Sequence, residues 1–157
     1  ILLYPQNGEA FTMLMKRPEY KGAHSGQVSF PGGKKEADDK SLQETALREA
    51  EEEVGVGANQ VSIIGQMTDL YIPASNFLVS PYVGFAETRP NFIPDKKEVE
   101  SLLPTSIEML CDERVKKETT IKSSGGFLLN VPYYHLHKQV VWGATAMIIS
   151  ELEAILQ

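Results

Sequence analysis

Residues 30–56 read FPGGKKEADDKSLQETALREAEEEVGV. The segment opens with a Pro-Gly-Gly turn at residues 31–33 and ends in the acidic run REAEEEVGV. Between them, apolar side chains recur at three- and four-residue steps, which predicts one core-facing side of an amphipathic helix. These side chains are Leu42, Ala46, Leu47, Ala50 and Val54.

Glu49, Glu52 and Glu53 recur at the same steps on another side of this helix, so their carboxylates are expected to converge. Like charges at this spacing repel, and a bound hard cation would remove the repulsion, because carboxylate oxygens are the ligands of Mg²⁺, Mn²⁺ and Ca²⁺. A solvated acidic face is the alternative. Arg48, which can pin a carboxylate, and Gly55, which can cap the helix, favour the metal site.

The segment resembles the Nudix box, G-x5-E-x7-R-E-U-x-E-E-x-G-U, in which U is a bulky apolar residue. Residues 48–56 fit the second half, with Ala50 small for its position. In the first half, counting from Gly33 brings Asp39 to the place of the glutamate, and one extra residue separates it from Arg48.

The same departure resembles the coenzyme A pyrophosphatase branch of this family, which carries an upstream motif L-L-T-x-R-[S/A]-x3-R-x3-G-x3-F-P-G-G. Arg17, Gly26 and residues 30–33 match that motif, whereas Gly22 stands in place of its second arginine. The resemblance implies an α+β fold, a Nudix-like α/β/α sandwich with a mixed curved sheet. It also implies hydrolysis of coenzyme A or its derivatives to 3′,5′-ADP and 4′-phosphopantetheine, with Mg²⁺ or Mn²⁺ as cofactor.

The expected metal ligands are Glu49, Glu53, Glu52 (directly or through water) and, from the resemblance, the carbonyl of Gly33. Arg48 is expected to orient a glutamate. The resemblance places a late acidic residue near Glu98, which gives a candidate general base, although an ordinary surface acid fits the sequence equally well. The catalytic set is therefore Arg48, Glu52, Glu53 and Glu98.

Basic residues upstream of the box are candidates for phosphate binding, because an arginine fork matches phosphate oxygens. Arg17 is preferred, since the upstream motif places it, and Lys16 adjoins it. Phe30 and Gly32 complete the expected substrate-binding set.

Two other functions stay open. One is a Nudix hydrolase of a different nucleotide, such as a dinucleotide or an oxidised deoxynucleoside triphosphate. The other is a nucleotide-binding regulatory module without catalysis, against which three converging carboxylates argue.

Composition predicts one globular domain spanning residues 1–157: the chain is 42% hydrophobic and 23% charged. A net charge of −6 argues against non-specific nucleic-acid binding, and no apolar run is long enough to span a membrane.

Cys111, the single cysteine, excludes an internal disulfide and fits a cytoplasmic protein. The oligomeric state stays open, a homodimer included. The chain starts at Ile1 inside an expected strand, so residues upstream of it are expected.

Patterning predicts the order of the remaining elements. Strands are expected at residues 1–4, 11–15, 27–30, 61–70, 77–86, 116–122, 127–134 and 139–142. Asn7-Gly8 is expected to turn the first pair, Gly65 to form a bulge, and Pro81 to bend its strand. Residues 71–76 and 89–97 are expected as loops, 98–103 as a short strand or turn, and Pro104 as the start of a short helix ending near residue 110. A last helix is expected at residues 143–156, with its core side formed by Ala144, Met147, Ile148, Leu152 and Leu156.

Overall fold

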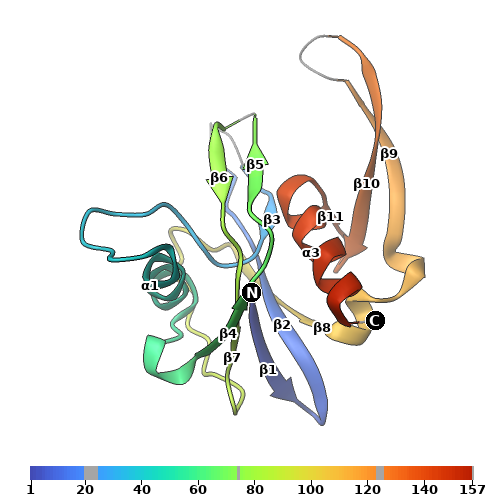
Figure 1. Cartoon of the computed structure of the whole chain (residues 1–157). Coiled ribbons are helices and arrows are strands. Elements are labelled where there is room, and N and C mark those ends of the chain that lie inside the picture. The colour runs from blue at the N-terminus through green and yellow to red at the C-terminus, as the bar shows by residue number, and fades with distance from the viewer. Residues whose placement is uncertain (20–24, 74, 123–125, 157) are drawn as a thin grey trace. The chain divides into compact units, whose positions relative to one another are not determined.

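A computed structural model describes residues 1–19, 25–73, 75–122 and 126–156 (Figure 1). The chain divides into two compact units, Ile1–Ile107 and Glu108–Gln157. The structure is mixed α+β with a curved mixed sheet, which confirms the expected fold class.

The first unit is built on a six-stranded sheet. Its strands are β1 (Leu2–Gln6), β2 (Glu9–Lys16), β3 (Val28–Ser29), β4 (Ser62–Gln66), β7 (Tyr82–Phe85) and β8 (Ser101–Ser106). β1 and β7 are parallel, and the other pairs are antiparallel. Residues 11 and 12 of β2 pair with both β1 and β8, and residues 15 and 16 pair with both β3 and β8. β8 therefore lies on the opposite side of β2 from β1 and β3.

Local chemistry explains two turns of this sheet. Asn7 and Gly8 have φ of 54° and 83°, as a two-residue hairpin turn requires, and they join β1 to β2 as expected. The register of β4 against β7 shifts between Ile63 and Gly65, which confirms the bulge expected near Gly65.

Helix α1 (Leu42–Val54) is flanked by two capping residues, Ser41 and Gly55. The side chain of Ser41 accepts a hydrogen bond from the Glu44 amide at 3.1 Å, so Ser41 is the N-cap. Gly55 closes the helix in the left-handed conformation, with φ of 75°. Val54 and Val56 are then buried in the core of the first unit. That core also contains Leu2, Tyr4, Met13, Met15, Ala86 and Val99.

The buried side of α1 differs from the expected one. Leu42 was expected in the core but is 43% exposed, because it is the first residue of the helix and lies away from the packed end. Thr45 and Glu53 are buried instead. The face of α1 that turns inward is therefore partly polar.

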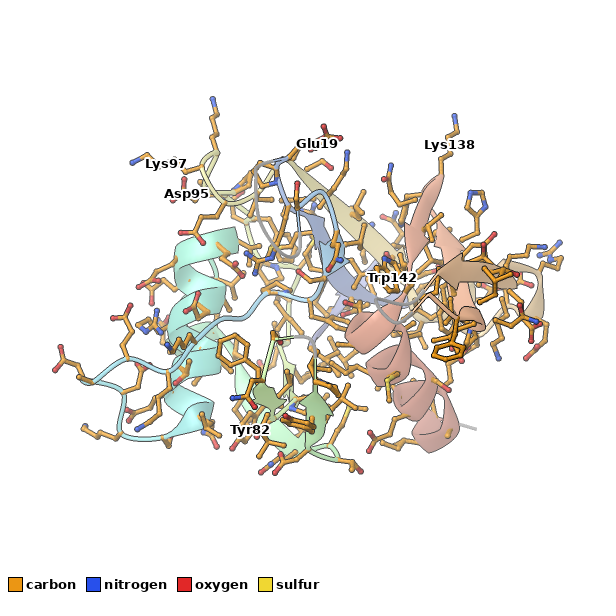
Figure 2. All side chains as sticks on the ribbon, turned by 90° about the horizontal axis from the view of Figure 1, so that it is seen from above. Glu19, Tyr82, Asp95, Lys97, Lys138 and Trp142 are labelled. Atoms are coloured by element: carbon orange, nitrogen blue, oxygen red, sulfur yellow. The ribbon has the colours of Figure 1, made fainter. Side chains whose placement is uncertain are left out.

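The segment after β7 runs alongside the end of α1. The amide of Ile93 donates to the carbonyl of Val54 at 2.9 Å, and the amide of Asp95 donates to that of Glu53 at 3.0 Å. Figure 2 labels Asp95 and Lys97 on this segment, beside the helix. The loop expected at residues 89–97 is confirmed, and its backbone fixes the end of the helix.

Three expectations in the first unit differ from the structure. Residues 71–76 do not form one loop, because β5 (Leu70–Ile72) and β6 (Phe77–Val79) make a hairpin across them. The strand expected at residues 77–86 with a bend at Pro81 is interrupted there, at Ser80 and Pro81, which separate β6 from β7. Pro104 does not begin a helix; it lies inside β8, opposite Met13.

The second unit contains a three-stranded sheet and the last helix. After α2 (Ile107–Leu110) and a 3-10 turn (Glu113–Val115), it consists of β9 (Lys116–Lys122), β10 (Leu128–Leu136), β11 (Gln139–Val141) and α3 (Gly143–Leu156). The strands expected at residues 116–122, 127–134 and 139–142 and the last helix are confirmed within one or two residues of their limits, and residues 123–125 lie outside the described residues. Along α3, Ile148 and Leu152 are buried as expected, but Met147 and Leu156 are exposed and Ile149 is buried. No helix among the described residues is long and apolar enough to cross a membrane.

Candidate active site

Glu53 lies at the centre of the site. It occupies the last turn of α1, is 1% exposed, and accepts hydrogen bonds from Arg17 Nη2 at 3.0 Å and from the Gly32 amide at 2.8 Å. Arg17 Nη2 also lies 3.2 Å from the carbonyl oxygen of Gly32. Burial raises the pKa of Glu53 to about 7, although Gly32 and Arg17 act to lower it. The residue after β2, the glycine turn and α1 therefore meet at one carboxylate.

Glu49 lies one helical turn before Glu53 and faces Gly33. A Cβ added to Gly33 would lie 2.6 Å from Glu49 Oε2, and closer still to the Cδ and Oε1 atoms. Position 33 thus leaves no room for a side chain while Glu49 is in place. Burial raises the pKa of Glu49, and the charges of Glu52 and Glu98 act in the same direction.

Arg48 holds the acidic cluster through several bonds. Its Nε and Nη2 donate to the two carboxylate oxygens of Asp39 at 3.0 and 3.1 Å. Nη1 donates to Glu52 at 2.9 Å, and Nη2 also lies 3.1 Å from Glu49 Oε1 and from the Lys34 carbonyl oxygen. Arg48 therefore orients two glutamates and fixes the box loop, as we name residues 31–40.

Asp39 is the site residue that was missing from the predicted set. Besides Arg48, it accepts hydrogen bonds from the Thr45 hydroxyl and the Glu36 amide, both at 2.9 Å. The bond from Arg48 holds the pKa of Asp39 well below its usual range. The signal was present in the sequence, because Asp39 stands where the box pattern has its first glutamate.

The residues expected to bind substrate are spread over several environments. Lys16 Nζ is bonded to Glu100 at 2.8 Å, and Phe30 is buried. Arg17 and Gly32 both contact Glu53, so they lie within the site. Gly22, at the place of the second arginine of the upstream motif, lies outside the described residues.

Comparison with known proteins decides the family. A model described as "NUDIX domain" matches residues 1–118. The chain belongs to the Nudix family. The "Uncharacterized Nudix hydrolase NudL" of Yersinia enterocolitica serotype O:8 / biotype 1B is 37% identical over 145 residues, which cover 92% of this chain and 73% of that protein. The protein of the same description from Yersinia pestis strain Pestoides F is 35% identical, with 92% and 71% covered.

Solved structures show the same fold. The Nudix domain of Shewanella oneidensis NrtR, crystallised with ADP ribose, aligns with a TM-score of 0.60 and 13% identity, covering 99% of this chain and 84% of that one. A MutT Nudix hydrolase from Burkholderia pseudomallei aligns with a TM-score of 0.56 and 16% identity, covering 96% and 93%. As a Nudix hydrolase, the chain acts on diphosphate linkages of nucleotide derivatives, and enzymes of this family generally need a divalent cation such as Mg²⁺ or Mn²⁺.

The carboxylates of this Nudix hydrolase fit such a cation. Glu49 and Glu53 are both buried enough to raise their pKa, and each is repelled by the other or by Glu98, so a positive charge between them would be favoured. Glu52 is 56% exposed and turned to Arg48. Within the described ranges, no three His, Cys, Asp or Glu side chains are already grouped as a metal site. A third protein ligand would therefore be the Gly33 carbonyl, or Glu52 after its side chain rotates.

Glu98 is brought to the same place from a distant part of the chain. Its amide donates to the Asp95 carbonyl at 3.1 Å, in the segment that runs beside the end of α1. Its charge contributes to the raised pKa of both Glu49 and Glu53. Glu98 is thus close enough to the two buried glutamates to interact with them electrostatically.

Proposed function

We propose that this Nudix hydrolase cleaves the diphosphate linkage of coenzyme A or its derivatives, giving 3′,5′-ADP and 4′-phosphopantetheine, with Mg²⁺ or Mn²⁺ as cofactor. One observation carries the proposal. Arg17 and Gly32, which belong to the upstream motif of the coenzyme A branch, bond directly to Glu53 of the box. The upstream motif, which suggests the substrate, is therefore hydrogen-bonded to the box, which suggests the chemistry.

The site residues divide the work of hydrolysis. A diphosphate is anionic and repels a nucleophilic hydroxide, and a divalent cation held by Glu49, Glu53 and the Gly33 carbonyl would supply compensating positive charge. Arg17 and the Gly32 amide keep the buried Glu53 in position. Arg48 does the same for Glu49 and keeps Glu52 within reach of the site.

Glu98 is the proposed general base. A water molecule attacks one phosphorus atom while its proton passes to the Glu98 carboxylate. The bond between that phosphorus and the bridging oxygen breaks, and the bridging oxygen leaves with the second phosphate. The proton on Glu98 is afterwards returned to solvent or product, so that one water is consumed for each linkage cleaved.

Arg17 is the proposed contact for a substrate phosphate. One of its terminal nitrogens is engaged with Glu53 and Gly32, but its side chain is 24% exposed, and a guanidinium has five N–H donors. Lys16 would first have to leave Glu100, to which it is bonded at 2.8 Å. Arg17 therefore has the better access to phosphate.

The test is incubation with coenzyme A, with and without Mg²⁺ or Mn²⁺, followed by chromatography and mass determination of the products. Metal-dependent appearance of 3′,5′-ADP and 4′-phosphopantetheine is the expected result. The same panel contains a dinucleotide and an oxidised deoxynucleoside triphosphate. Cleavage of one of these with coenzyme A left intact would retain the Nudix chemistry and refute the coenzyme A proposal.

Two variants show whether the cleavage belongs to the site. Glu53→Gln keeps the size and the buried position of the side chain but removes its charge, and it should reduce turnover by at least 100-fold (~2.7 kcal/mol in the barrier). Glu118→Gln removes a carboxylate from β9, in the second unit, and serves as the control. Binding of nucleotide by the wild type without any cleavage would instead favour the regulatory-module alternative.

A further inference from the structure

The β5–β6 hairpin (Figure 1) carries exposed apolar side chains that the proposed reaction does not use. Ile72 is paired with Phe77 and Tyr71 with Leu78. Because directly opposed residues share a face and neighbours along a strand alternate, Ile72 and Phe77 lie on one face and Tyr71 and Leu78 on the other. Phe77 is 45% exposed, a large aromatic surface left open to solvent.

Lys34 shows which face of the hairpin is turned to the active site. Its Nζ lies 6.0 Å from the centroid of the Phe77 ring. Lys34 follows Gly33 in the box loop, and its carbonyl oxygen accepts a hydrogen bond from Arg48 Nη2 at 3.1 Å. The Phe77 face therefore lies one lysine side chain away from the backbone that packs against Glu49.

We propose that Phe77 stacks on the aromatic base of the nucleotide substrate and that Lys34 pairs with one of its phosphates. This inference rests on the proposed function only in requiring a nucleotide diphosphate as substrate. In coenzyme A the stacked group is the adenine. Phe77 and Lys34 then set the preference of the enzyme for a nucleotide over a diphosphate without a base.

The chemistry of the two side chains matches the two ends of such a ligand. A nucleotide carries a flat aromatic base and anionic phosphates on one small molecule, and Phe77 and Lys34 offer a ring face and a cation next to each other. Base stacking on an aromatic side chain is tolerant of the base but needs an accessible ring. The Phe77 ring is accessible, whereas the hydroxyl of Tyr71, on the other face, is bonded to Asn76 at 2.9 Å within the hairpin.

The acidic residues near the box loop explain why a cation at Lys34 would help to bind a phosphate. Glu49, Glu52 and Glu53 crowd the helix side of the box loop, so a phosphate approaching the site meets negative charge there. Lys34 supplies a cation on the hairpin side, and it can leave the ring for a phosphate at little cost, because an exposed cation–π contact is weak.

The experiment compares Phe77→Ala with Leu78→Ala, its neighbour on the opposite face, which is 61% exposed. With the nucleotide substrate that the wild type cleaves, Phe77→Ala should raise KM about ten-fold, the effect expected for one stacked base, while Leu78→Ala leaves KM unchanged. Phe77→Trp should retain the wild-type KM. Lys34→Ala should also raise KM, and Lys35→Ala on the same loop is its control.

A binding measurement separates this inference from the proposed function. In Phe77→Trp, ADP should quench the fluorescence of the new tryptophan, whereas pyrophosphate, which has no base, should not. Leu78→Trp should respond to neither ligand, and Trp142 contributes equally to both variants. If Phe77→Ala and Leu78→Ala have the same KM, or if ADP and pyrophosphate quench Phe77→Trp equally, the role of Phe77 is overturned. If ADP quenches Phe77→Trp as expected but the wild type cleaves no diphosphate, the proposed function is refuted and the role of Phe77 is retained.

Discussion

Replacing Gly33 by alanine should disable the enzyme while leaving its fold intact. The added Cβ would lie 2.6 Å or less from the carboxylate of Glu49, whereas ordinary van der Waals contact begins at 3.4 Å. The carboxylate must therefore move by about 0.8 Å or more, and a misplacement of about 1 Å in a catalytic constellation can cost about 100-fold in rate. We expect kcat/KM to fall by about that factor and the metal concentration for half-maximal rate to rise.

Stability should respond very differently from activity. The φ of Gly33 lies outside the left-handed region, so alanine can adopt its backbone conformation. The atoms it meets are the end of a flexible side chain, and alanine at a compatible position restricts the unfolded chain. The melting temperature should therefore stay close to that of the wild type.

The assay is the initial rate of metal-dependent hydrolysis at several Mg²⁺ concentrations, with thermal unfolding measured on the same samples. Gly65→Ala is the matched control, because its added Cβ meets nothing within 4 Å and its φ is also outside the left-handed region. In a Glu49→Gln background, Gly33→Ala should have little further effect, since the ligand it displaces is already lost. Wild-type kcat/KM and metal dependence in Gly33→Ala would refute the placement of Glu49 as a ligand.

Three further perturbations test other parts of the site. Ser41→Ala should lower the free energy of unfolding by about 1 kcal/mol, measured by denaturant titration, because the Glu44 amide loses its cap; an unchanged midpoint would contradict the cap. Arg48 lowers the pKa of Asp39 in the folded protein, so the stability from this pair is present above about pH 4 and is lost as the pH falls through the folded value. Asp39→Asn should remove that part of the acid dependence of the melting temperature, and parallel curves for the two proteins would argue against it. Glu98→Gln should lower kcat and change the pH–rate profile, and an unchanged rate and profile would exclude Glu98 as the base.

The sequence predicted those elements whose limits are set by neighbouring residues. Ser41 and Gly55 fix the two ends of α1, and Asn7-Gly8 fixes the first hairpin, because capping and turn formation depend on local backbone chemistry. The helical period likewise places Glu49 and Glu53 one turn apart, but it does not show that Glu52 turns away to Arg48.

The wrong expectation at Pro104 depends on a pairing partner that is distant in the sequence. Pro104 is tolerated inside β8 because, in the described part of the chain, that strand pairs with β2 and with no other strand, and proline within sheets occurs mainly in such edge strands. Nothing local to Pro104 distinguishes such an edge strand from a helix start. The hairpin across residues 71–76 is local and was missed for a different reason: its strands have three residues each and show no clear period.

The hydrogen-bond partners of the site residues could not be predicted from local sequence patterns either. Arg17 was expected to face substrate, and the structure shows it bonded to Glu53, 36 positions away. Glu98 reaches the site because the segment after β7 bonds to the end of α1. Both contacts arise from tertiary packing around the end of α1, which local sequence patterns do not reveal.

The inward face of helix α1 was predicted only in part, since Val54 is buried as expected, and the part that was wrong is informative. An ordinary surface helix buries its apolar side, yet here Glu53 is buried and Leu42 is exposed. A buried carboxylate is costly unless it is bonded, and Glu53 is bonded to Arg17 and to a backbone amide. Its raised pKa shows that these bonds do not fully offset the burial. Natural sequences break local rules of this kind mainly at functional sites, and a bound divalent cation would supply the charge that the protein alone leaves uncompensated.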